Sequence, residues 1–211
     1  MKNDEYERLM KLKTFETSLD TAGVKYTGGI DEVGRGPLAG PVLACCIIMP
    51  MDSYIEGVND SKKISANKRK KLFDIILSEC LDYGIGMADE KTIDSINILN
   101  ATHLAMKRSI ENMRIKPEHL LIDAEKLDSV EIPSTSIVKG DSLSYNIACA
   151  SIVAKVIRDR IMVDYSHLYN TYNFEKNKGY GTSEHIAAIK KYGLCKIHRT
   201  SFCKHFTGEK I

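Results

Sequence analysis

The chain has 211 residues, 43% hydrophobic and 27% charged, with a net charge of +2, which suits one compact globular domain. Its longest apolar run, Val42–Met49, is far shorter than the roughly 20 residues of a membrane span, and the polar, acidic N-terminus lacks the apolar segment of a signal peptide. We therefore expect a cytoplasmic protein rather than a membrane or secreted one, and a monomer by default.

The N-terminal part of the chain predicts a helix followed by two paired strands. Apolar residues at helical spacing predict a helix over Glu5–Leu19, which Gly23 would end. Tyr26–Val33 and Val42–Met49 are two apolar runs joined by a short connection rich in glycine and proline. This arrangement favours a β-hairpin.

Helices and strands alternate along the rest of the chain. Ser65 is a plausible N-cap for a helix that continues to about Cys80. The remaining expected elements are a strand over Tyr83–Ala88, a helix over Ile93–Met113, strands over His119–Asp123 and Ser134–Val138, a helix from Gly140-Asp141-Ser142 to near Asp164, and a helix capped by Thr182 or Ser183 that ends before Gly193. This order predicts an α/β fold, with a mixed sheet flanked by helices.

Two adjacent acids, Asp31 and Glu32, lie in the first apolar strand and precede a glycine-rich stretch. Burying ionised carboxylates costs several kcal/mol unless a cation or a partner such as Arg35 compensates. Pairing with Arg35 would explain one acid, whereas two acids followed by glycines favour a binding site. Because successive strand residues point to opposite faces, both acids can serve one site only if the strand twists or ends there, which Gly34 makes possible.

Two further acids lie at the expected ends of a strand and a loop. Asp123 ends the apolar run Leu120–Ile122, where ligands collect in open α/β sheets, although a turn or a helix cap would also explain it. Asp141 follows Gly140 and, taken alone, is better explained as an N-cap than as a catalytic residue. Together with the acids of the first strand, they suit Mg²⁺ or Mn²⁺, which prefer oxygen ligands. Two such ions about 3.5–4 Å apart can clamp the attacking and leaving oxygens of a phosphodiester.

The four acids stand in motifs that follow one another along the chain. The most specific is Gly29–Val42, with the sequence GIDEVGRGPLAGPV. The others are Asn59–Ser65, Leu121–Asp123, Lys139–Ser142, Ala150–Asp159, Lys178–Thr182, Tyr192-Gly193 and His198–Phe202. In this order they resemble the ribonuclease HII family of the ribonuclease H-like superfamily over residues 29–202. The chain departs from the family pattern at Ala124, where glycine is frequent, and at Cys149, where alanine is usual.

The resemblance implies one domain over residues 1–211 with a ribonuclease H-like α/β fold. It implies a catalytic core over about 26–165 and a helical substrate-binding part over about 166–211. It also implies that Asp31, Glu32, Asp123 and Asp141 are the catalytic ligands of a two-ion Mg²⁺ or Mn²⁺ site. The implied activity is an endonuclease that cuts the RNA strand of RNA–DNA hybrids and single ribonucleotides embedded in duplex DNA, leaving 5′-phosphate and 3′-hydroxyl ends.

The same resemblance implies how RNA is distinguished from DNA. The Gly34-Arg35-Gly36 loop would read the ribose 2′-hydroxyl through backbone groups, since glycines let a backbone approach a ligand closely and the 2′-hydroxyl separates RNA from DNA. Tyr180 would stack on the sugar next to the scissile phosphate. Without the motif, a core or turn tyrosine would be the simpler interpretation of Tyr180.

The net charge conceals an asymmetry that fits a polyanionic partner. Residues 1–141 carry 19 Lys+Arg and 23 Asp+Glu, whereas residues 142–211 carry 11 and 5; a solvated surface would have the same composition. The candidate phosphate contacts are Lys62, Lys63, Lys155 and Arg158, although Lys155 could instead pair with Asp159. The four cations at 68–71 crowd a helix start, where the helix dipole disfavours them, so they face either phosphate or solvent.

Several alternatives are less favoured. Cys195, His198, Cys203 and His205 could hold zinc, but their spacing matches no common zinc pattern, and a packed C-terminal segment is expected instead. A non-catalytic nucleic-acid-binding module would not need all four acids. Ribonuclease HIII carries a sizeable N-terminal substrate-binding domain, and only 30 residues precede the first acid here. Binding to a sliding clamp stays open, since no docking tail is evident after Phe206.

Overall fold

The computed structural model describes residues 3–207, and within them five strands form one mixed sheet in the order β3-β2-β1-β4-β5. The strands are β1 (Thr27–Val33), β2 (Val42–Ile48), β3 (Asp82–Ala88), β4 (His119–Asp123) and β5 (Ser134–Ile137). β1, β2 and β3 pair antiparallel as a meander, whereas β4 is parallel to β1 and β5 is parallel to β4. The predicted hairpin and the mixed sheet are confirmed.

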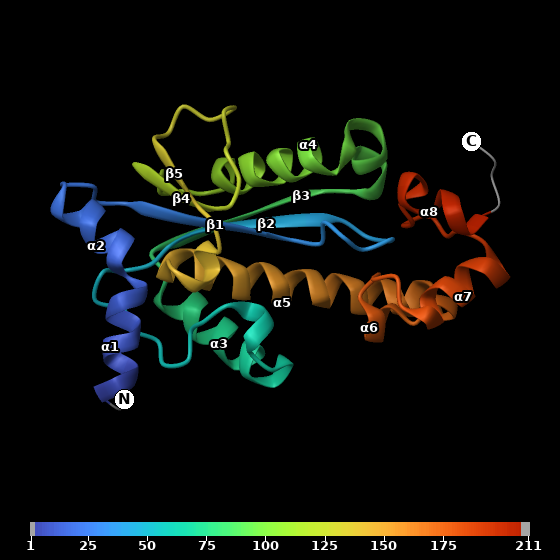
Figure 1. Ribbon diagram of the computed structural model, residues 1–211, viewed down its shortest axis with the longest axis horizontal. Coiled ribbons are helices and arrows are strands. Elements are labelled where there is room, and N and C mark those ends of the chain that lie inside the picture. Colours follow the sequence, from blue (N-terminus) through green and yellow to red (C-terminus); the bar gives the residue numbers. More distant parts are fainter. Residues whose placement is uncertain (1–2, 208–211) are drawn as a thin grey trace.

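Helices cover both faces of this sheet (Figure 1). Helix α4 (Glu90–Glu111) lies on one face, and α5 (Tyr145–Leu168) lies on the other with α3 (Ala66–Glu79) packed beside it. The helices at the two ends of the molecule are α1 (Asn3–Leu12), α2 (Thr14–Thr21), α6 (Phe174–Asn177), α7 (Ser183–Tyr192) and α8 (Thr200–Thr207). In residues 3–207, none of these helices has the length and apolar character to cross a membrane.

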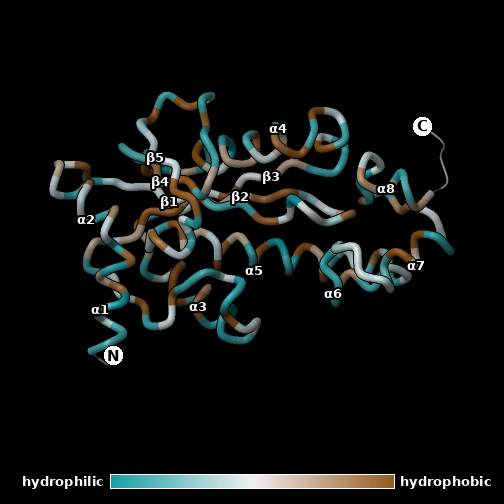
Figure 2. Tube along the Cα trace, in the orientation of Figure 1, coloured by the Kyte–Doolittle hydropathy of each residue, from teal (hydrophilic) through white to brown (hydrophobic). Residues whose placement is uncertain are grey.

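The hydrophobic core fills both sides of the central strands, where apolar residues concentrate (Figure 2). All of β2 is buried, and its side chains alternate between two clusters. Leu43 and Ile47 pack with residues of α3 and α5, whereas Ala44 and Ile48 pack with residues of α4. A strand buried on both faces has a continuous apolar sequence rather than an alternating one, which is why Val42–Met49 is the longest apolar run.

Glycines let the two long helices lie unusually close to the sheet. A Cβ atom at Gly29 of β1 would lie 2.3 Å from the backbone carbonyl carbon of Asn146 in α5. A Cβ atom at Gly86 of β3 would lie 2.0 Å from the carbonyl oxygen of Ala105 in α4. Neither distance is compatible with a side chain, so these positions fix the spacing between strands and helices.

The predicted helix over Glu5–Leu19 is wrong in one respect, because it is divided at Lys13 into α1 and α2. The ammonium group of Lys13 is buried and donates hydrogen bonds to the carbonyl oxygens of Pro50 and Met51, at 2.9 and 2.8 Å. It also lies 4.6 Å from the ring centre of Tyr145. The break follows from these long-range contacts, which helical periodicity does not report.

The start of the helix predicted from Gly140 is also corrected. Residues Gly140–Ser142 form a separate 3₁₀ turn, and α5 begins at Tyr145 with Ser144 as its N-cap. The Ser144 hydroxyl accepts a hydrogen bond from the amide of Ile147. Asp141 is therefore not the cap of this helix. The short helices α6 and α8 were not predicted, and residues 1–2 and 208–211 of the predicted single domain lie outside the described residues.

Candidate active site

Three parallel strands bring the four predicted acids to one edge of the sheet. β1 is paired with β4 as far as Ile30, so Asp31 and Glu32 continue past the last paired residue of β4. Asp123 ends β4 at the same level. β5 runs parallel to β4, and the loop that follows it carries Asp141. The carboxyl ends of parallel strands thus gather acids that lie up to 110 residues apart in sequence.

The adjacent acids Asp31 and Glu32 of β1 point to different sides of the sheet, but both lie near Asp123. The side chain of Ser151 from α5 lies near Asp31 and lowers its pKa, whereas Glu32 lies 3.4 Å from the guanidinium of Arg35. Burial is the largest cause of the raised pKa of both carboxyl groups, and the negative charge of Asp123 adds to it in each case. Because β4 ends beside them, both acids approach Asp123.

Buried negative charge is concentrated at this edge. Burial raises the pKa of Asp123 and Asp141 as well, and the charge of Asp60 raises both further. Lys62 is a nearby cation. Burial alone would lower the pKa of its ammonium group, but surrounding carboxylates, with Asp141 the strongest, outweigh burial and raise it. The acids therefore stabilise positive charge placed among them.

The donor set fits a divalent metal ion. Carboxylate oxygens are the ligands that Mg²⁺ and Mn²⁺ prefer, and Glu32 Oε2 is buried without a hydrogen-bond partner among the described residues. Within residues 3–207, no three Asp, Glu, His or Cys side chains are already arranged as a closed metal-binding group.

Two acids that the sequence analysis did not single out belong to the surroundings of the site. The charge of Asp60 helps to raise the pKa of Asp141, and the Asp60 carboxylate accepts a hydrogen bond from the amide of Lys62 at 2.9 Å. Glu125 accepts hydrogen bonds from Arg35 and from His103, the latter at 3.2 Å. Asp60 could have been found from the sequence, because it lies in the motif Asn59–Ser65. No sequence feature indicated Glu125, because its contacts come from distant segments.

The departure at Ala124 has a structural explanation. Its φ is +53°, in the left-handed region that favours glycine, at a cost of about 1 kcal/mol for another residue. The turn lets the Ala124 amide donate to the Ile137 carbonyl at 3.1 Å. The Gly140 amide donates to Asp123 Oδ1 at 2.7 Å. Alanine thus keeps the loop that orients the third acid.

Arg158 is a correction to the predicted phosphate contacts. Its side chain is fully buried, and its guanidinium donates to the carbonyl oxygens of Pro41, Lys178 and Ala39 at 2.9, 3.0 and 3.2 Å. A phosphate could reach it only if these bonds broke, so Arg158 supports the loop between β1 and β2. The sequence spacing placed it on a helix face with Lys155 but could not show that this face is buried.

Tyr180 lies beside the same loop. Its side chain is 41% exposed, and the ammonium group of Lys155 is 5.8 Å from its ring centre. Lys155 also pairs with Asp159 at 2.8 Å, as the alternative interpretation held. The amide of Leu38 donates to the carbonyl of Gly179 at 2.8 Å. An exposed aromatic ring is thereby held next to the glycine-rich loop.

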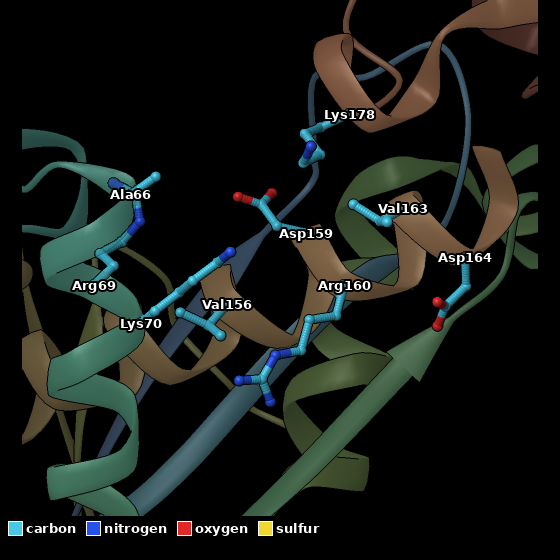
Figure 3. Close-up of a pocket in the computed structure, with 9 residues that line it drawn as sticks. All are labelled: Ala66, Arg69, Lys70, Val156, Asp159, Arg160, Val163, Asp164 and Lys178. Atoms are coloured by element: carbon cyan, nitrogen blue, oxygen red, sulfur yellow. The ribbon is translucent and has the colours of Figure 1, made fainter. Parts of the chain in front are cut away.

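A basic groove extends from this region between α3 and α5 (Figure 3). The cavity has a volume of about 400 Å³, and its charged lining residues are Arg69, Lys70, Asp159, Arg160, Asp164 and Lys178. Of the cations at 68–71, Arg69 donates to the carbonyl oxygens of Ser61 and Ile64, so it is structural. Lys70 is exposed and lines the groove. Lys62 and Lys63 are also exposed, and Lys63 donates to the Ser142 hydroxyl at 3.2 Å.

The cysteine and histidine cluster near the C-terminus forms hydrogen bonds beneath Tyr180. His185 Nδ1 bonds the Tyr180 carbonyl oxygen at 2.9 Å, so this nitrogen carries a proton. His185 Nε2 lies 3.0 Å from His198 Nε2, and the Cys195 amide donates to His198 Nδ1 at 2.9 Å. All three bonds are satisfied when both rings are neutral and His198 carries its proton on Nε2. Cys203 is buried and His205 is exposed, and neither takes part in the three hydrogen bonds described above.

This pair predicts a loss of stability in acid. Burial, followed by the charge of His185, lowers the pKa of His198 from 6.5 to about 4. Between pH 4 and 6.5, the unfolded chain therefore binds the proton more readily than the folded protein does. The contribution of neutral His198 to the free energy of unfolding is complete above pH 6.5 and is lost as the pH falls toward 4. The loss is on the order of 2 to 3 kcal/mol. In urea unfolding, the stability advantage of wild type over His198→Gln should shrink as the pH falls across this window. An advantage that stays constant with pH would contradict the assignment.

Comparison with known proteins agrees with the fold and the site. The mixed sheet with helices on both of its faces places the chain in the class of proteins with the ribonuclease H-like fold. The family model of Ribonuclease HII matches residues 28–205. Ribonuclease HII of Acetivibrio thermocellus is 54% identical over 202 residues, which cover 96% of this chain and 79% of the relative. The chain belongs to the ribonuclease HII family and is an endoribonuclease that acts on RNA–DNA hybrids with a divalent metal ion.

Solved structures are similar over most of the chain. The crystal structure of ribonuclease H2 from Pyrococcus horikoshii OT3 has a TM-score of 0.70 at 25% identity, covering 87% of this chain and all of that one. Ribonuclease HII in the PCNA complex from Archaeoglobus fulgidus has a TM-score of 0.73 at 20% identity, covering 88% of this chain and 98% of that one. Both confirm the predicted ribonuclease H-like α/β fold.

Proposed function

We propose that Asp31, Glu32, Asp123 and Asp141 bind two Mg²⁺ or Mn²⁺ ions and that this centre hydrolyses the RNA strand. The observation that carries the proposal is the meeting of four carboxyl groups with raised pKa at the ends of parallel strands. Bound ions would supply Lewis-acid chemistry that promotes attack of water on phosphorus and stabilises the leaving 3′-oxygen. The products would carry 5′-phosphate and 3′-hydroxyl ends.

The residues around the acids would position the substrate. The Gly34-Arg35-Gly36 loop would contact the ribose 2′-hydroxyl, and the exposed ring of Tyr180 would stack on the adjacent sugar. Lys62, Lys63 and Lys155 would contact phosphates, with Lys70 and Lys178 extending the contact along the groove between α3 and α5. Such contacts give affinity and salt dependence without reading the sequence.

The wider organisation follows the same proposal. Residues 26–165 would form the catalytic core, and residues 166–211, of which 208–211 are not described, would form the substrate-binding part of one monomeric domain. The six cysteines are free thiols, which is usual in a reducing compartment and supports a cytoplasmic location. A sliding clamp is a candidate partner, because the Archaeoglobus fulgidus relative was solved with PCNA.

The experiment that tests this function uses a DNA duplex with one embedded ribonucleotide and a matched all-DNA duplex. We expect a single cut beside the ribonucleotide, with Mg²⁺ or Mn²⁺ and not with EDTA, and no cut in the all-DNA duplex. Mapping of the ends should give 5′-phosphate and 3′-hydroxyl. Equal cleavage with EDTA would exclude the metal centre, and cleavage of long hybrids alone would exclude embedded ribonucleotides as substrates.

A further inference from the structure

The loop between β1 and β2 accepts hydrogen bonds from an arginine that lies about 160 residues further along the chain. Arg199 lies just before α8 and is fully buried. Its guanidinium donates to the carbonyl oxygens of Gly34 at 2.5 Å, of Arg35 at 2.8 Å and of Gly40 at 2.8 and 3.0 Å. Among the described residues, no carboxylate lies within ion-pair distance of it.

A buried guanidinium without a carboxylate partner is costly unless its donors are satisfied by other acceptors. Here every acceptor is a backbone carbonyl of the glycine-rich loop. Arg158 forms a similar set of bonds, but its acceptors lie at Ala39, Pro41 and Lys178. Of the two arginines, only Arg199 donates hydrogen bonds to the carbonyls of Gly34 and Arg35.

These two bonds determine where the next two amides point. In a planar trans peptide the carbonyl and the amide point in opposite directions. With the Gly34 and Arg35 carbonyls turned inward to Arg199, the amides of Arg35 and Gly36 turn away from it, and Gly34 adopts a φ of +94° to allow this. Neither amide is hydrogen-bonded to another residue in the part of the chain described, 3–207. Gly36 is exposed, and the Arg35 side chain from the same turn reaches Glu32.

We infer that Arg199 is a specificity-determining positioning residue, which orients the amides of Arg35 and Gly36 as a pair of donors for a ribose 2′-hydroxyl. The inference rests on the proposed function. It assigns the discrimination between ribose and deoxyribose to a side chain that does not touch the nucleic acid. A 2′-hydroxyl can accept these hydrogen bonds, whereas deoxyribose has no atom at that position and leaves both donors unmatched.

The test compares binding of two duplexes in Asp123→Asn protein, where hydrolysis is blocked. One duplex contains a single ribonucleotide, and the other is DNA of the same sequence. Arg199→Lys keeps the charge but loses the planar fork that reaches several carbonyls at once. We expect it to reduce the preference for the ribonucleotide about tenfold, with all-DNA binding unchanged. Arg158→Lys is the matched control, because it changes a buried guanidinium that packs against Gly34 but donates to neither the Gly34 nor the Arg35 carbonyl, and it should keep the preference.

Further variants separate specificity from folding. Gly36→Pro removes one donor directly at an exposed position with Arg199 intact, and should lower the preference even if Arg199→Lys fails to fold. Arg114→Lys, on a side chain that is 91% exposed, should change neither binding nor cleavage. An unchanged preference in folded Arg199→Lys or in Gly36→Pro, or equal losses for both duplexes, would overturn the inference. If Asp123→Asn protein itself shows no preference, the proposed function fails instead.

Discussion

Asp123→Asn is expected to lower the rate of hybrid cleavage by at least about 1000-fold while leaving the protein folded and able to bind hybrid. Loss of about 4 kcal/mol of transition-state stabilisation corresponds to this factor. Asparagine keeps the acceptor for the Gly140 amide, so the loop after β5 should hold its position. What it removes is a negative charge that stabilises cations at the ends of β1 and β4.

The measurement is single-turnover cleavage of a labelled hybrid at saturating protein, with binding followed separately by gel shift. Asp128→Asn makes the same chemical change on an exposed residue five positions later and should cleave at the wild-type rate. Normal cleavage by Asp123→Asn with Mg²⁺ would remove this acid from the metal centre. Loss of hybrid binding together with cleavage would indicate a role in substrate binding instead.

Gly29→Ala is expected to destabilise the protein by about 3 kcal/mol or more. The added methyl group would lie 2.3 Å from the backbone of Asn146, and backbone cannot move aside as a flexible side chain can. Since a loss of 1 kcal/mol lowers the melting temperature by roughly 2–4 °C in a protein of this size, the shift should be about 6–12 °C. Cleavage should also weaken, because α5 carries Ser151, which lies near Asp31.

Urea unfolding and thermal melting of metal-free protein measure this effect. Gly36→Ala is the matched control for stability, because no atom lies within 4 Å of the added Cβ and its φ is not in the left-handed region. It should change the free energy of unfolding by no more than about 0.5 kcal/mol. If Gly29→Ala were as stable as Gly36→Ala, β1 and α5 would not be packed as closely as described.

Local patterns predicted most of the sheet because its strands are apolar and bounded by turns. The hairpin of β1 and β2 and the parallel strands β4 and β5 fall close to their predicted ranges. Local patterns failed where a long-range contact decides the backbone. Lys13 breaks the first helix to reach the carbonyls of Pro50 and Met51, and no feature of Glu5–Leu19 reports those partners.

The residues of the proposed site also fall into those that local sequence patterns predicted and those that they did not. Its four acids were found because they stand in motifs, and the parallel strands bring them to one edge. Asp60, Glu125 and Arg199 were not singled out, because their roles depend on partners 81, 90 and 164 residues away. Arg158 was assigned to the surface because spacing on a helix gives its face and not whether that face is buried.

The distance along the chain between Arg35 and Arg199 bears on synthesis of the protein. Ribosomes produce β1 and the turn after it early, but the guanidinium that closes this turn emerges 164 residues later. A nascent chain would therefore hold its acids before the turn beside them is secured. Full discrimination between the two sugars would begin only once the segment that carries Arg199 has been made, so chains that stop before this segment would lack that selectivity.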